Sequence, residues 1–174
     1  EDALTLLNSI DKPIIDNDFS EKEYNEYQTL LSEALYKNYY DQPNHNEIII
    51  ACAYFDSLSA LYPQNIEITF LFSKALYYKA VGFEELDKTK EAFNSYLKSL
   101  ESIDKIKINK KKVNKKLHNE IQHFKALIYT RLGDLLYWHD VYDAATECIT
   151  RANELFYLEE NQNALSRNNI ILAV

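Results

Sequence analysis

Glycine and proline are scarce in this chain, and this scarcity restricts its fold more than any other feature of the sequence. The 174 residues include 2 Gly and 3 Pro, where average usage would give roughly 12 and 9. Turns between strands and open loops need these residues, whereas the interior of a helix excludes them. The composition therefore predicts an all-α chain. Because 47% of the residues are hydrophobic and no long uninterrupted apolar run occurs, we expect a globular domain that is neither disordered nor embedded in a membrane.

Apolar positions at helical spacing predict where the helices lie. They indicate seven helices and a partial one that begins near residue 163, the seven being residues 3–10, 20–40, 47–61, 66–81, 88–103, 118–139 and 140–158. Ser20 and Glu23 have the spacing of a capping box at the start of the second helix. Pro63 follows the end of the third helix, and Gly82 is expected to end the fourth.

The helices recur in pairs, and residues 126–159 carry the clearest repeat pattern. Large, small and aromatic residues occupy fixed positions on its first helix, and small and aliphatic residues on its second: Tyr129, Leu132, Gly133, Ala145, Ile149 and Ala152. Small side chains at such positions let two helices approach closely. A weaker earlier copy is indicated by Ala51, Phe55, Pro63, Ser73 and Ala92.

This pattern resembles the tetratricopeptide repeat family, whose unit is about 34 residues long. The spacing here is stretched, because Ala51 and Ala92 are 41 residues apart and Ala92 and Ala145 are 53 apart. The resemblance implies an α-α superhelix of antiparallel helix pairs with seven to eight helices. It implies one domain over residues 1–174, with pairs at 20–62, 66–108 and 118–158 and a partial helix at 163–174.

Two short stretches resemble a more particular group, the bacterial extracytoplasmic tetratricopeptide proteins. Residues 30–39 are similar to the opening of those proteins, and residues 166–168 to the start of a further repeat. The resemblance implies a periplasmic or membrane-anchored sensor or scaffold for signal transduction, with a lipoprotein-type signal upstream. A cytoplasmic regulator is the alternative. The chain begins at Glu1, contains no Met and ends on an apolar run at 170–174, so we expect it to be a piece of a longer protein.

In a stack of such repeats the first helix of each pair lines the concave side. The inward positions form the candidate binding surface: Phe70, Lys74, Tyr77, Tyr78, Thr130, Asp134, Tyr137, Trp138 and Arg167. The corresponding positions of the first pair are Thr29, Glu33, Tyr36 and Lys37. We expect a groove that binds a peptide or a helix of another protein through aromatic anchors and a few charges. The alternative is that several of these rings pack between helices, and that Trp138 closes the end of a helical hairpin.

Charge and chemistry narrow the function further. The net charge is −8, which argues against nucleic acid as the partner. Residues 105–116 carry seven Lys and no acidic residue; this run is interpreted as a solvated helix end and loop, with docking of an acidic partner as the alternative. Cys52 and Cys148 are too far apart in sequence for a zinc motif, and His118 and His123 do not have the spacing of a metal pair. The sequence thus predicts no enzyme, no metal and no cofactor, and a protein or peptide partner, with self-assembly into a homo-oligomer as an alternative.

Overall fold

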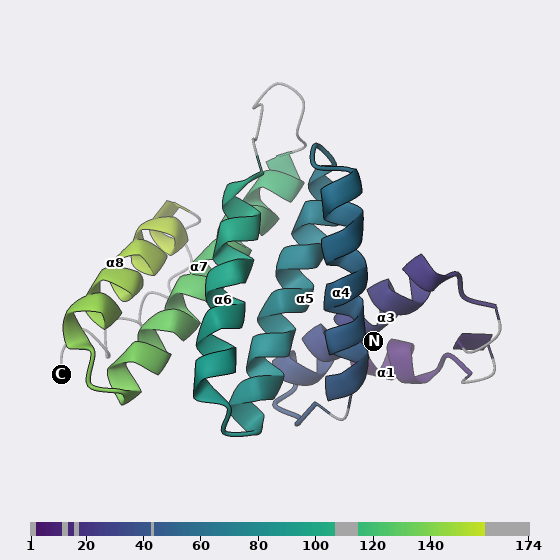
Figure 1. Ribbon diagram of the computed structural model, residues 1–174, viewed down its shortest axis with the longest axis horizontal. Helices are drawn as coiled ribbons and strands as arrows, with labels where there is room; N and C mark the ends of the chain where they lie inside the picture. Colours follow the sequence, from purple (N-terminus) through teal and green to yellow (C-terminus); the bar gives the residue numbers. More distant parts are fainter. Residues whose placement is uncertain (1–2, 12–13, 16–17, 43, 107–114, 159–174) are drawn as a thin grey trace. The chain divides into compact units, whose positions relative to one another are not determined.

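The computed structural model describes residues 3–11, 14–15, 18–42, 44–106 and 115–158, and this part of the chain contains helices and no strand. The helices discussed below are α1 (Ala3–Asn8), α3 (Glu21–Lys37), α4 (His45–Leu61), α5 (Ile66–Glu85), α6 (Thr89–Asp104), α7 (Lys115–Trp138) and α8 (Tyr142–Leu158). The consecutive helices α3, α4 and α5 pack against one another, and α7 packs against α8 (Figure 1). The predicted all-α fold of paired helices is confirmed. The partial helix predicted at 163–174 lies outside the described residues, as does the central part of the lysine run, 107–114.

The chain divides within α6 into two compact units, residues 1–95 and residues 96–174. In the first unit, α4 packs against both α3 and α5, α3 also contacts α5, and α1 lies on α3. In the second unit, α7 and α8 form a hairpin. The end of α6 is tied to α7 by an ion pair of Lys125 with Asp104, and the guanidinium of Arg131 donates to the Tyr96 hydroxyl at 3.4 Å.

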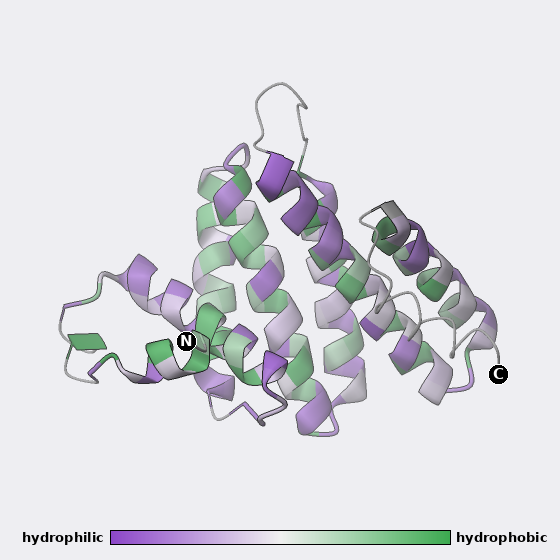
Figure 2. Ribbon diagram, turned by 180° about the vertical axis from the view of Figure 1, so that it is seen from behind, coloured by the Kyte–Doolittle hydropathy of each residue, from purple (hydrophilic) through white to green (hydrophobic). Residues whose placement is uncertain are grey.

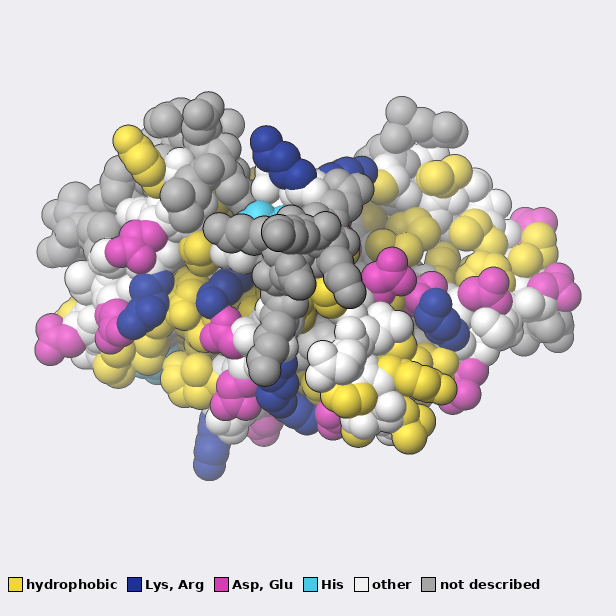
Figure 3. Space-filling view, turned by 90° about the horizontal axis from the view of Figure 1, so that it is seen from above, with side chains coloured by type: hydrophobic (Ala, Val, Ile, Leu, Met, Phe, Trp, Pro, Cys, Tyr) yellow, Lys and Arg dark blue, Asp and Glu magenta, His cyan; other side chains and the backbone are white. Residues whose placement is uncertain are grey.

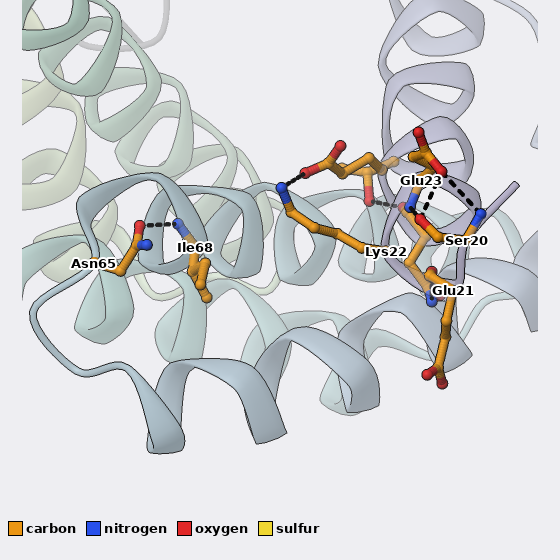
Figure 4. Close-up of polar contacts among 9 residues, drawn as sticks. Ser20, Glu21, Lys22, Glu23, Asn65 and Ile68 are labelled. Carbon is orange, nitrogen blue, oxygen red and sulfur yellow. Dashed lines mark hydrogen bonds and ion pairs between the residues drawn. The ribbon is translucent and has the colours of Figure 1, made fainter.

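Side-chain caps fix where α3 and α5 begin (Figure 4). The Oγ of Ser20 accepts from the backbone N–H of Glu23 at 3.3 Å, and the Glu23 carboxylate accepts from the backbone N–H of Ser20 at 2.8 Å. This reciprocal pair is the predicted capping box, and the hydrogen bonds from Ser20 lower the pKa of Glu23. At α5, the Oδ1 of Asn65 accepts from the N–H of Ile68 at 3.1 Å. Each cap satisfies a backbone donor that a helix start leaves unpaired.

The first helix of each pair ends in the same backbone motif. Tyr39 after α3, Asp87 after α5 and Asp140 after α7 have φ angles of 59°, 56° and 62°. The N–H of the next residue reaches back five positions in each case, as in Val141 N to Leu136 O at 3.0 Å. This is the Schellman arrangement, in which glycine usually takes the left-handed position. In this chain, Tyr or Asp takes the left-handed position after each of these three helices.

The prediction that Gly82 ends the fourth helix is wrong. Helix α5 continues through Gly82 to Glu85, and Gly82 is buried within it. A β-carbon at this position would lie 2.5 Å from Nδ1 of His45, at the start of α4. The glycine is therefore needed for the close approach of α4 and α5, whose ends are also joined by His45 Nε2 and Glu85 Oε2 at 3.5 Å.

Gly133 has the equivalent role between α7 and α8. A β-carbon there would lie 2.5 Å from Cδ1 of Ile149 and 3.3 Å from the backbone oxygen of Ala145. Ser73 and Ala92, the other small residues of the repeat pattern, are fully buried. Within the second unit, α7 and α8 also share a core of Ala126, Ala152 and Phe156 against which Tyr129 packs. The small residues therefore lie in buried packing, as the repeat pattern predicts.

Hydrophilic residues are interspersed with hydrophobic residues along the helices (Figure 2). Within the described part of the chain, none of the helices has the length and continuous hydrophobicity required to cross a bilayer.

Candidate functional site

The predicted inward positions of the first two pairs come together where α3 meets α5. The carboxylate of Glu33 on α3 binds the ammonium of Lys37 at 2.6 Å and that of Lys74 on α5 at 2.8 Å. Beside this ion pair, the Tyr77 hydroxyl donates to the Tyr36 hydroxyl at 3.3 Å. Residues that are 41 positions apart in the sequence therefore lie side by side.

We call Glu33, Tyr36, Lys74 and Tyr77 and the rings beside them the α3–α5 cluster. The carboxylate of Glu33 is paired with the ammonium groups of Lys37 and Lys74. Burial raises the pKa of Glu33, but the ammonium groups of Lys74 and Lys37 together outweigh burial, and the net effect is a pKa below the ordinary value. Lys74 also lies over the ring of Phe70, 5.2 Å from its centroid. The half-buried ion pair of Glu33 and Lys74 thus links α3 to α5.

The aromatic residues that α5 contributes to this cluster are buried. The rings of Tyr77 and Tyr78 pack edge-to-face on each other, with centroids 5.1 Å apart, and both contact Tyr36. Tyr77 and Tyr78 are 0% and 2% exposed, and Phe70 is buried as well. The expectation that these three rings present an open surface is therefore wrong. They pack between helices, which is the alternative that the sequence left open.

The positions predicted on α7 differ in their exposure. Thr130 is buried and its hydroxyl donates to the backbone oxygen of Ala126 at 3.1 Å, so it does not present an open surface either. Asp134 and Tyr137 are half-buried. Trp138 is 78% exposed, so it does not close the end of the hairpin, and the alternative proposed for it is wrong. Arg167, the last predicted position, lies outside the described residues.

An exposed aromatic surface surrounds the turn from α7 to α8. We call it the hairpin-end patch and define it as Tyr137, Trp138, Asp140, Val141 and Tyr142. The ring of Tyr137 packs edge-to-face on Trp138, with centroids 6.0 Å apart, and on Tyr142, with centroids 5.7 Å apart. Trp138, Val141 and Tyr142 all belong to the exposed large hydrophobic residues.

The backbone of the patch is fixed by hydrogen bonds. The N–H of Asp140 donates to Tyr137 O at 3.1 Å, and the hydroxyl of Tyr142 donates to the Asp140 carboxylate at 2.6 Å. The hydrogen bond and the charge of that carboxylate raise the pKa of Tyr142. The rings are therefore exposed but held in defined positions, as in a preorganised binding surface.

Sequence reasoning found Tyr137 and Trp138 but missed Asp140, Val141 and Tyr142. It placed the predicted surface on the first helix of each pair and assigned residues 140–142 to the start of the second helix, 140–158. Helical spacing does not apply across a turn, so it gave no signal for these three residues.

The cysteines and His123 lie in the packing of the helices. The ring of His123 packs on Phe156, with centroids 5.5 Å apart. Cys52 is buried, and Cys148 is half-buried, so that burial raises the pKa of its thiol. In the described ranges, no three His, Cys, Asp or Glu side chains gather into a group that could hold a metal ion.

The face seen in Figure 3 mixes both signs of charge. Lys and Arg side chains lie among Asp and Glu side chains, with hydrophobic side chains exposed between them. As far as its described residues go, this face has no continuous basic surface of the kind that nucleic-acid backbones require.

Comparison of the chain with protein-family models, with curated proteins and with solved structures found no match. The resemblance to tetratricopeptide repeats therefore stays a prediction from the residue pattern. The burial of Ser73, Ala92, Gly133 and Ala145 is compatible with it.

Proposed function

We propose that this chain is a non-catalytic helical-repeat domain that binds a protein or peptide partner through the hairpin-end patch. The observation that carries this proposal is the exposure of Trp138 and Tyr142, at 78% and 54%, on a turn whose backbone is fixed. Trp and Tyr contribute large contact areas and are enriched among the residues that dominate binding energy. Because the rings are held by neighbouring rings and by Asp140, they lose little conformational entropy on binding.

The proposed site differs from the concave groove that the sequence pattern indicates. The inward-facing rings of α5 are buried, so a partner could reach them only after local rearrangement. The hairpin-end patch needs no such rearrangement. The further assignment to an extracytoplasmic tetratricopeptide protein with a sensing or scaffolding role is also our proposal, and it is supported by the resemblance of residues 30–39 and 166–168.

Selection from a displayed random peptide library tests the proposed function. We expect the domain to enrich a set of related peptides whose binding is lost in the Trp138→Ala/Tyr142→Ala variant. Tyr157→Ala is the matched control, because Tyr157 is 72% exposed near the other end of α8. Circular dichroism checks that each variant is folded. Enrichment of no peptide, or equal binding by all three proteins, would contradict the proposal.

Self-assembly is a second candidate, favoured by the outer face of α4. Ile49, Ile50 and Leu61 are 39%, 57% and 70% exposed on this helix, and Asp56 is the exposed charge among them. An apolar face of this kind can pack on the same face of a second copy. Sedimentation equilibrium of the wild type and of Ile50→Lys tests it: a concentration-dependent dimer that the substitution abolishes supports self-assembly, and a monomer at all concentrations excludes it.

A further inference from the structure

The hairpin-end patch combines aromatic rings with a local excess of negative charge. Residues 132–150 contain Asp134, Asp140, Asp143 and Glu147 and no Lys or Arg. Glu147 binds Arg151 at 3.0 Å, whereas Asp143 is exposed in the first turn of α8. Asp134 is half-buried, so the exposed carboxylates at this turn are those of Asp140 and Asp143.

The end of α7 adds to this negative potential. Helix α7 is 24 residues long and has no basic residue in its last turn. The carbonyl end of a helix carries a partial negative charge that favours a cation nearby. The last turn of α7 does not itself supply such a cation.

Aromatic faces and carboxylates together select a particular chemistry. The negative face of an indole or phenol ring attracts a cation, and an arginine guanidinium can also stack on the ring while it donates hydrogen bonds to a carboxylate. Uncharged or acidic segments would bury the rings but gain nothing from Asp140 and Asp143. The patch is thus complementary in charge to a planar cation carried by a polypeptide.

We infer that the hairpin-end patch binds an arginine-containing segment of a partner protein, with the guanidinium over the Trp138 ring and paired with Asp140 or Asp143. This inference rests on the proposed function and names the class of partner for the same site. A lysine side chain would bind more weakly, because an ammonium cannot stack on the indole while it keeps a two-point contact with a carboxylate.

Titration with short peptides that alternate Gly with Arg, with Lys or with citrulline tests the inference. Citrulline has the shape of arginine without its charge. Trp138 is the single Trp, so its fluorescence reports binding at the patch directly. We expect a saturable change with the Arg peptide that weakens with added salt, and at least about tenfold weaker binding of the citrulline peptide.

Variants assign the binding to the patch. Asp140→Asn/Asp143→Asn removes both charges, and Asn still tolerates the left-handed backbone that Asp140 adopts. We expect this variant to bind the Arg peptide and the citrulline peptide alike, whereas Tyr157→Ala binds as the wild type does. Binding by Trp138→Ala is followed by the anisotropy of a labelled peptide and is expected to be lost.

The outcomes separate the inference from the proposed function. Equal binding of the Arg and citrulline peptides by the wild type, or unchanged Arg-peptide binding by Asp140→Asn/Asp143→Asn, would overturn the inference. If uncharged peptides from the displayed library nevertheless bind in a way that depends on Trp138, the proposed function survives. If neither the defined peptides nor the library peptides bind, both fail.

Discussion

Replacing Gly133 by alanine tests the packing that defines the α7–α8 hairpin. In the interior of a helix, alanine is more favourable than glycine by about 1 kcal/mol. If the position were open to solvent, Gly133→Ala would therefore stabilise the protein. The structure predicts instead that Gly133→Ala destabilises the protein.

The expected magnitude follows from the neighbours of the added β-carbon. It would lie 2.5 Å from Cδ1 and 2.7 Å from Cγ1 of Ile149, and Ile149 is 0% exposed. The backbone oxygen of Ala145 on α8 would lie 3.3 Å from the added β-carbon. The new methyl group would therefore press on the backbone of α8 as well as on the Ile149 side chain. Overpacking of this kind typically costs about 1–3 kcal/mol. The gain in helix propensity offsets part of this cost. The free energy of unfolding should therefore fall by about 1 kcal/mol in Gly133→Ala.

A double-mutant cycle with Ile149→Val shows whether the two side chains are the cause. Ile149→Val removes the Cδ1 atom and alone should cost about 0.5–1.5 kcal/mol. In the Gly133→Ala background it should cost nothing or stabilise, because it removes the nearest clash; coupling of neighbours is about 0.5–3 kcal/mol. Denaturant unfolding followed by circular dichroism measures all four proteins. Thr150→Ala, at an exposed position of α8, should stay within about 0.5 kcal/mol of the wild type.

Stabilisation by Gly133→Ala to the full extent of the helix propensity, or strict additivity with Ile149→Val, would refute the tight α7–α8 contact. It would also remove the physical basis for assigning the repeat pattern to this helix pair.

Three other measurements check separate parts of the structure. Tyr39 is 97% exposed and has a φ of 59°, so Tyr39→Gly should stabilise the protein to denaturant by about 0.5–1 kcal/mol, because glycine adopts this conformation without strain, whereas Tyr39→Ala should be nearly neutral. The folded-state pKa of Glu33 lies below its unfolded value, so its ion pair with Lys74 stabilises the folded state above the ordinary pKa of glutamate, about 4.3. That stability should be lost as the pH falls through the lower folded-state pKa, and acid unfolding should show less pH dependence in Glu33→Gln. A thiol reagent should label Cys148 slowly, because burial raises the pKa of its thiol, and should label Cys52, which is 4% exposed, only after unfolding.

Each measurement has an outcome that contradicts it. Equal stability of the glycine and alanine variants at Tyr39 would show that the left-handed cap carries no strain. Identical acid unfolding of wild type and Glu33→Gln would show that the ion pair does not favour the ionised carboxyl. Rapid labelling of two thiols in the folded protein would contradict the burial of Cys52.

The residue pattern predicted the helices well but one of their ends badly. Helix periodicity and the capping box at Ser20 are local properties, so the beginning of α3 could be read directly. Gly82 has the residue type of a helix end, yet α5 continues beyond it to Glu85. The absence of a side chain at Gly82 instead leaves room for the ring of His45 on α4. Asp87, which ends α5 in the left-handed conformation, carries no comparable signal.

The sequence by itself determined the all-α class, the pairing of helices and the small residues between them, because periodicity and side-chain size act over a few turns of one helix. It also assigned equivalent positions of α3 and α5 to the inward side, but only the structure showed that Glu33 contacts Lys74 and that Tyr36 contacts Tyr77. Only the tertiary structure decided which aromatic residues are accessible. Tyr77 and Trp138 have the same character on corresponding helices, but Tyr77 is enclosed by Tyr36 and Tyr78, whereas Trp138 lies at the end of its hairpin, where packing stops. Exposure depends on what the neighbouring helices cover, and that is a property of the whole fold rather than of any one segment.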